Sequence, residues 1–151
     1  GSRVEEFNLF WLEDVTAHDD YPGLARVAEA LATPIAGGEY VYGLAPFRHM
    51  LEARSVDIAM IDVLRSGGIT GWMKIAGMAE AFNVPVVNHL YPEISVHLVA
   101  AIPHGLTVEY MPWSSKLYEE VPQQINGELI VPDKPGLGLK FDQAALKKYG
   151  A

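Results

Sequence analysis

The sequence predicts an α/β fold of about five parallel βα units, followed by an irregular C-terminal tail. Short apolar runs alternate with amphipathic stretches of 10 to 14 residues, which is typical of strands and helices in a parallel sheet. The 151 residues have the length of one domain. After residue 111 this alternation ends and Pro and Gly become frequent. We therefore expect the βα units over residues 3–111 and the tail over residues 112–151.

Five apolar runs are predicted as strands, namely Leu9–Leu12, Thr33–Ala36, Ile58–Ile61, Val84–Val87 and Leu106–Val108. Helices are predicted after the first four runs, because apolar residues recur there at helical spacing. Pro22 and Pro92 stand where the first turns of two of these helices should be. In the tail, we expect one short strand at Leu129–Val131, a loop at Lys134–Gly138 and a last helix over Asp142–Tyr149.

Composition and charge exclude several classes of protein. The formal net charge is -8, which argues against nucleic acid or an anionic membrane as a partner. Without cysteine, the chain can form neither disulfides nor thiolate metal sites. No apolar run reaches the roughly 18 residues of a transmembrane helix, and no signal peptide is visible. We expect a cytoplasmic location. Gly1 and Ser2 resemble a cloning scar, and the uncapped start at Arg3–Phe7 suggests part of a longer polypeptide.

Each predicted strand ends in an ionisable residue, and the spacings of 26, 23, 27 and 20 residues each approximate one βα unit. These residues are Glu13, Glu39, Asp62, His89 and Glu109. In a parallel barrel the C-terminal strand ends share one face, where catalytic side chains lie. A single carboxylate at a strand end is more often a helix cap or loop anchor, but five in register favour one common site.

The residue types indicate distinct roles within such a site. Glu13 and Glu39 on adjacent strands suit a hard cation such as Mg²⁺, which prefers oxygen ligands. Asp62 can orient His89 and raise its basicity, which makes a general base. Glu109 can donate a proton or a hydrogen bond from the opposite side of a substrate. Arg65 is expected to form a salt bridge with Asp62 or a neighbouring acid, and Trp72 and Trp113 to be packing residues.

Several segments resemble, in order and spacing, the mandelate racemase and muconate lactonizing enzyme family of the enolase superfamily, over about residues 10–138. They are Trp11–Asp14, Ala36–Glu39, Asp62–Thr70, Asn88–Leu90 with Glu93 and His97, and Pro135–Gly138. The resemblance is to the mandelate racemase-like subgroup, which includes sugar-acid dehydratases. It implies the C-terminal half of a (β/α)8 (TIM) barrel.

The resemblance also implies functional roles. Glu13 and Glu39 would be Mg²⁺ ligands, and Asp62 and His89 would be the dyad that removes the proton α to a carboxylate. Glu109 would bind the carboxylate of a hydroxy-acid or sugar-acid substrate as the enediolate forms. The outcome would be racemisation or β-elimination of water.

Some parts of the family pattern have no counterpart in this sequence. They are a third acidic metal ligand, a Lys-x-Lys base motif and an N-terminal capping domain, and Val15 replaces the usual proline. We therefore expect an enzyme fragment that is inactive or nearly so alone and binds Mg²⁺ weakly. Its open sheet edges should bind the missing N-terminal half or a second copy. The alternative is a stand-alone partial-barrel scaffold without activity.

Overall fold

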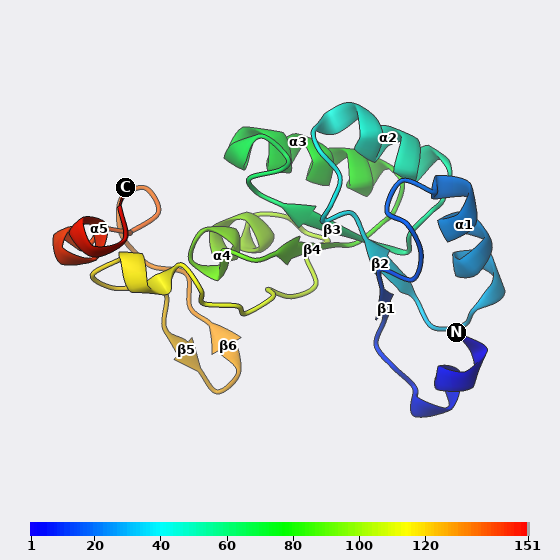
Figure 1. Ribbon diagram of the computed structural model, residues 1–151, viewed down its shortest axis with the longest axis horizontal. Helices are drawn as coiled ribbons and strands as arrows, with labels where there is room; N and C mark the ends of the chain where they lie inside the picture. The colour runs from blue at the N-terminus through cyan, green and yellow to red at the C-terminus, as the bar shows by residue number, and fades with distance from the viewer. Residues whose placement is uncertain (151) are drawn as a thin grey trace.

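The computed structural model describes residues 1–150, and it contains a parallel four-stranded sheet with sequential strand order (Figure 1). The strands are β1 Leu12–Glu13, β2 Ile35–Gly37, β3 Ile58–Asp62 and β4 Val86–His89. The helices are α1 Tyr21–Ala30, α2 Leu44–Glu52, α3 Gly68–Ala81 and α4 Pro92–Ala100. Each strand therefore leads into a helix before the next strand, which confirms the α/β class and the partial barrel predicted from the sequence.

The predicted fifth strand, Leu106–Val108, is reduced to one parallel bridge between Val86 and Gly105. The amide of Val86 donates to the carbonyl of His104 at 3.0 Å, and the amide of Leu106 donates to the carbonyl of Val86 at 2.9 Å. Beyond this point the amide of Glu109 donates to the side chain of Asn88 at 2.9 Å. The side chain of Asn88 thus accepts a hydrogen bond in place of a backbone carbonyl of β4. Residues 106–109 therefore run beside β4 without forming a regular strand.

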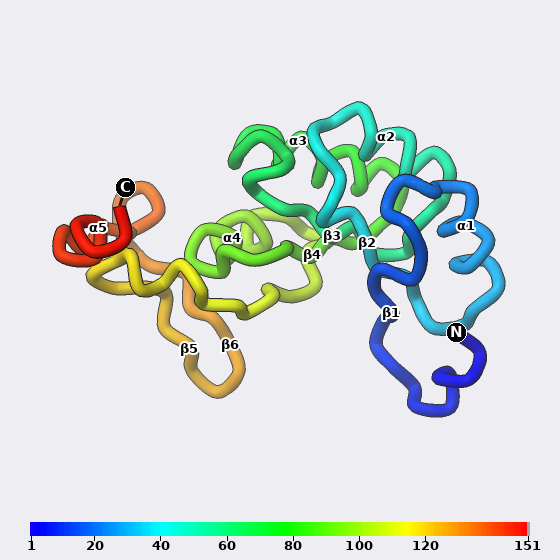
Figure 2. Tube along the Cα trace, in the orientation of Figure 1, coloured from blue at the N-terminus to red at the C-terminus, as the bar shows by residue number. Residues whose placement is uncertain are grey.

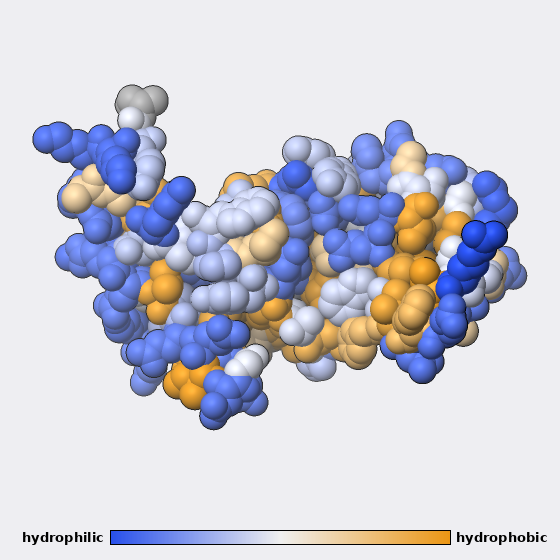
Figure 3. All heavy atoms as spheres, turned by 60° about the horizontal axis from the view of Figure 1, so that its bottom comes forward, coloured by the Kyte–Doolittle hydropathy of each residue, from blue (hydrophilic) through white to orange (hydrophobic). Residues whose placement is uncertain are grey.

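The two faces of the sheet have different surroundings. Ala59 and Ile61 of β3 pack with the helices in the main core, which contains the fully buried Trp72 of α3. The alternate residues Ile58 and Met60 point to the other face, as the period of two in a strand requires. Figure 3 shows apolar surface near the β1 end of the molecule. There, Leu9, Phe10, Trp11 and Thr107 line an open groove of about 410 Å³.

The helix starts follow the sequence signals. Asp20 caps α1 by accepting a hydrogen bond from the amide of Gly23 at 2.9 Å, and Pro22 stands in the first turn. Pro92 likewise opens α4. No helix among residues 1–150 is long and apolar enough to cross a membrane.

The tail extends beyond α4 and away from the other helices, as the chain trace shows (Figure 2). It contains the 3₁₀ helix η2 Ser115–Leu117, the antiparallel pair β5 Gln124–Ile125 and β6 Glu128–Leu129, and α5 Gln143–Tyr149. The short strand expected at Leu129–Val131 therefore lies slightly earlier and has a partner. The tail contacts α4 where His97 Nε2 lies 3.1 Å from the carbonyl oxygen of Leu137.

Candidate functional site

The C-terminal strand ends bring the predicted residues to one edge of the sheet. Glu13 ends β1, Asp62 ends β3 and His89 ends β4, while Glu39 follows β2 by two residues. Strand pairing places Asp62 directly opposite His89. The site is therefore assembled by parallel register, which turns separations of more than 20 residues into neighbouring positions.

Asp62 and His89 form a buried pair. His89 Nδ1 lies 2.7 Å from Asp62 Oδ2, and only 4% of Asp62 and 9% of His89 are exposed. The other oxygen of Asp62 accepts the backbone amides of Leu64 at 2.7 Å and Arg65 at 2.8 Å. Because a carboxylate can only accept, Asp62 favours the tautomer of His89 in which Nδ1 carries the proton and donates it. The basic nitrogen of His89 is then Nε2.

An acidic cluster lies beside this pair. Glu13, Asp14 and Glu39 each offer a carboxylate oxygen, and these atoms lie within 4.8 Å of one another. Glu39 Oε1 is also 3.5 Å from His89 Nε2. Burial raises the pKa of Glu39, the charge of His89 opposes this rise, and the nearby carboxylates of Asp14 and Glu13 add to it. An all-oxygen set of negative groups fits a hard divalent cation such as Mg²⁺.

Asp14 was not among the predicted site residues. Its backbone adopts the left-handed conformation, with φ of 51°. In a regular strand the side chain of Asp14 would point to the opposite face from Glu13, but here its carboxylate lies in the same cluster. The signals in the sequence were the adjacent acidic pair and its place in the segment Trp11–Asp14, which resembles the family.

Gly38 places Glu39 through a close backbone approach. Its φ of 126° disfavours any side chain, and an added Cβ would lie 2.7 Å from the carbonyl oxygen of Met60. The turn after β2 therefore requires glycine.

Replacing Gly38 with alanine should destabilise the chain by more than about 1 kcal/mol, because both the clash and the backbone strain oppose folding. Urea unfolding followed by circular dichroism measures this change. The control is Gly77→Ala in α3, where an added Cβ meets nothing within 4 Å. That variant should gain about 0.5 to 1 kcal/mol. Equal effects of the two substitutions would contradict the argument.

Glu109 lies beside β4, although no regular strand carries it there. Its Oε2 accepts the amide of Leu90 at 2.6 Å. Leu90 and Tyr91 are both left-handed, with φ of 52° and 49°, in the turn between His89 and α4. In this structure Glu109 thus anchors the turn that follows His89.

Arg65 does not form the expected salt bridge with Asp62. Only its backbone amide reaches that carboxylate, whereas its guanidinium Nη1 donates to the backbone carbonyl of Glu39 at 2.7 Å. The guanidinium carbon also lies 4.9 Å from the centre of the Tyr40 ring. The expectation was wrong because two backbone amides and His89 already occupy the oxygens of Asp62.

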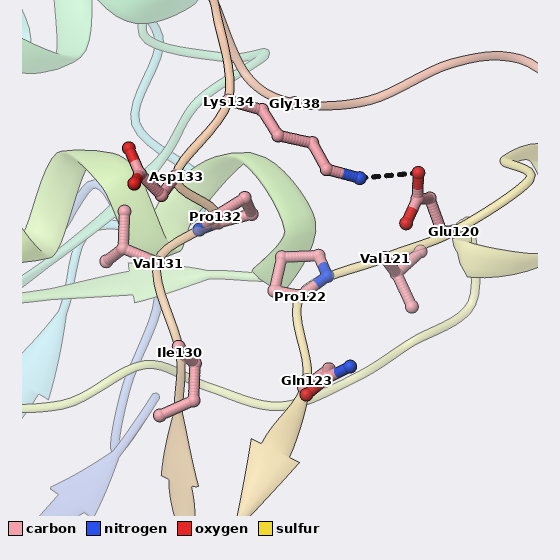
Figure 4. A pocket seen from close by; sticks show the side chains of 10 residues that line it. All are labelled: Glu120, Val121, Pro122, Gln123, Ile130, Val131, Pro132, Asp133, Lys134 and Gly138. Atoms are coloured by element: carbon pink, nitrogen blue, oxygen red, sulfur yellow. Dashed lines mark hydrogen bonds and ion pairs between the residues drawn. The ribbon is translucent and has the colours of Figure 1, made fainter.

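A separate pocket of about 250 Å³ lies in the tail (Figure 4). Its ion pair joins Lys134 Nζ to Glu120 Oε1 at 2.5 Å. It is lined by Glu120, Val121, Pro122, Gln123, Ile130, Val131, Pro132, Asp133, Lys134 and Gly138. None of the predicted site residues belongs to it, so it is distinct from the cluster at the strand ends.

Comparison with known proteins gives consistent matches. A family model described as enolase C-terminal domain-like matches residues 1–145. The D-xylonate dehydratase of Haloferax volcanii is 35% identical over 157 residues, covering 98% of this chain and 38% of that protein. The chain thus spans about two fifths of the length of such relatives.

Solved structures agree closely with the fold. The L-talarate dehydratase from Polaromonas sp. JS666, complexed with Mg and L-glucarate, has a TM-score of 0.93 and 36% identity, and the match covers 97% of this chain and 41% of that one. An enolase from Bradyrhizobium, complexed with magnesium and mandelic acid, has a TM-score of 0.92 and 31% identity, with 98% and 41% covered.

Proposed function

This chain belongs to the enolase C-terminal domain-like family, as its motifs indicated. We propose that it supplies the histidine base, His89, of an active site that removes the proton α to a carboxylate. The observation that carries the proposal is the buried Asp62–His89 pair, whose other ring nitrogen, Nε2, lies 3.5 Å from Glu39 in the acidic cluster. A base and a cation site are thus adjacent, which is the arrangement that this chemistry needs.

We assign the roles as follows. Glu13 and Glu39 would hold Mg²⁺, and Asp14 would be a further oxygen donor. When bound, Mg²⁺ neutralises the negative charge that develops on the substrate carboxylate. Asp62 keeps the Nδ1 proton of His89 in place, so Nε2 accepts the proton from the α carbon. In our proposal Glu109 donates a hydrogen bond to the substrate carboxylate through Oε1, because only Oε2 accepts the amide of Leu90.

The substrate class that we propose is a hydroxy acid or sugar acid. D-xylonate dehydratase and L-talarate dehydratase are among the relatives, and one neighbour holds mandelic acid. After the α proton is lost, departure of a β hydroxyl gives dehydration. Racemisation needs return of a proton to the opposite face, from an acid in the remaining part of the barrel. Both outcomes use the same base, so the proposal covers both.

We propose that residues 3–111 form the βα part and 112–151 the tail, and that the βα part needs further strands to close a barrel. The sheet has two open edges, the outer edge of β1 and the segment after Gly105. In our proposal each edge pairs with a second copy or with the part of the barrel found in longer relatives. Alone, the chain should bind Mg²⁺ weakly and turn over little or no substrate, because catalysis depends on positioning and on excluding water. A cytoplasmic location remains a prediction.

Replacing Glu39 with glutamine should weaken binding of Mg²⁺ by about tenfold or more, because an anionic oxygen ligand is lost. Isothermal titration calorimetry of the chain with Mg²⁺ alone measures the affinity. Glu119→Gln is the matched control, since Glu119 pairs with Lys140 in the tail at 2.8 Å. Equal affinities in the two variants would place the cation elsewhere.

The activity itself is tested by adding the remaining part of a relative's chain. Aldaric and aldonic acids are incubated with the chain, with and without that part, and α-proton exchange and dehydration are followed. Activity that appears only with the added part supports the proposal. A folded complex that shows neither reaction favours the inactive scaffold instead.

A further inference from the structure

Four contacts join the residues of the proposed site into a closed ring. His89 Nδ1 lies 2.7 Å from Asp62 Oδ2, and Asp62 Oδ1 accepts the amide of Arg65 at 2.8 Å. Nη1 of Arg65 donates to the carbonyl of Glu39 at 2.7 Å. Oε1 of Glu39 lies 3.5 Å from Nε2 of His89 and forms an ion pair with it when the ring is protonated. The ring thus connects the turns after β2, β3 and β4.

Arg65 is the one member of this ring that the proposed chemistry does not use. Within residues 1–150 its guanidinium forms no ion pair with a carboxylate. Instead it lies against the Tyr40 ring and holds the peptide that follows Glu39. Its own carbonyl accepts the amide of Gly43 at 3.1 Å, so the turn after β2 is held at two points. The planar guanidinium has a rigid donor geometry, which suits such a clamp.

We propose that Arg65 is a positioning residue, which fixes the turn after β2 so that Glu39 faces both His89 and the acidic cluster. Gly38 lets this turn approach β3 closely, and Arg65 holds it from the turn after β3. Residues that orient a metal ligand contribute strongly to affinity although they do not touch the ion. The effect on metal binding rests on the proposed function. The effect on the position of Glu39 relative to His89 does not, because those contacts are present in the metal-free chain.

The test compares Arg65→Met with Arg65→Lys and with Arg48→Met. Arg48 is an exposed arginine on α2 that pairs with Glu52, so its replacement removes the same charge away from the site. Binding of Mn²⁺ alone is followed by electron paramagnetic resonance, because Mn²⁺ accepts the same oxygen ligands as Mg²⁺. Nuclear magnetic resonance at one fixed pH records the His89 ring signals without metal. Thermal unfolding is recorded for each variant.

We expect Arg65→Met to weaken Mn²⁺ binding by about 10- to 100-fold and to move the His89 ring signals. Arg65→Lys should recover part of the affinity, because its ammonium group can still donate to the Glu39 carbonyl. Arg48→Met should change neither measurement. If Arg65→Met does not fold, Arg65→Gln replaces it, since glutamine keeps an N–H donor without the charge.

Wild-type affinity and unmoved His89 signals in the Arg65→Met chain would overturn the inference, as would an Arg65→Lys variant no better than Arg65→Met. If the wild-type chain binds no Mn²⁺, the proposed function fails. The His89 signals of the metal-free variants then still decide the positioning role: signals that move support it, and signals that do not move overturn it.

Discussion

We expect His89→Asn to lower the rate of α-proton removal by about 100- to 10,000-fold, once the chain is completed by the remaining part of a relative. Asparagine can keep a hydrogen bond to Asp62, but it has no basic nitrogen to accept the proton. The rate is measured as exchange of the α proton of a sugar acid with deuterium from solvent. Metal affinity should change far less, because His89 is not among the three carboxylates of the cluster.

The matched control for this substitution is His49→Asn. His49 lies exposed on α2, and its Nε2 is 3.1 Å from Nη2 of the neighbouring Arg48. Loss of exchange in both variants would point to damaged folding, and full exchange in His89→Asn would exclude His89 as the base. Asp62→Asn should also slow exchange, because an amide no longer fixes the tautomer of His89.

The largest expected effect on stability comes from Trp72→Ala, which should cost about 3 to 5 kcal/mol of unfolding free energy. Trp72 is 0% exposed between α3 and the sheet, and its Nε1 donates to the carbonyl of Ile61 at 3.1 Å. The substitution leaves a cavity and also removes the indole hydrogen bond to β3. Urea unfolding monitored by circular dichroism measures the loss.

Trp113→Ala provides the comparison for this prediction. Trp113 was expected to be a packing residue, but it is 65% exposed in the tail, so its removal should change stability by at most about 0.5 kcal/mol. A similar loss in both variants would show that Trp113 is covered in solution, for instance by a second copy or by the rest of a barrel.

Much of the candidate site follows from local sequence patterns. Glu13, Asp62 and His89 stand at the ends of apolar runs that recur at the βα period, and parallel strands bring such ends to one edge. The contact between Asp62 and His89 could therefore be predicted from two motifs 27 residues apart. Asp14 could not, because its contribution depends on a left-handed backbone that no periodicity reveals.

The sequence by itself determined the α/β class, the family and the chemical types at the strand ends, because these depend on periodicity and on short motifs. Tertiary structure alone decided the partners. Arg65 donates to the carbonyl of Glu39 because the oxygens of Asp62 are already occupied. Leu106–Val108 does not form a regular strand beside β4, because the side chain of Asn88 accepts the amide of Glu109. Such choices arise from competition among donors and acceptors on separate elements, which meet only when the sheet forms.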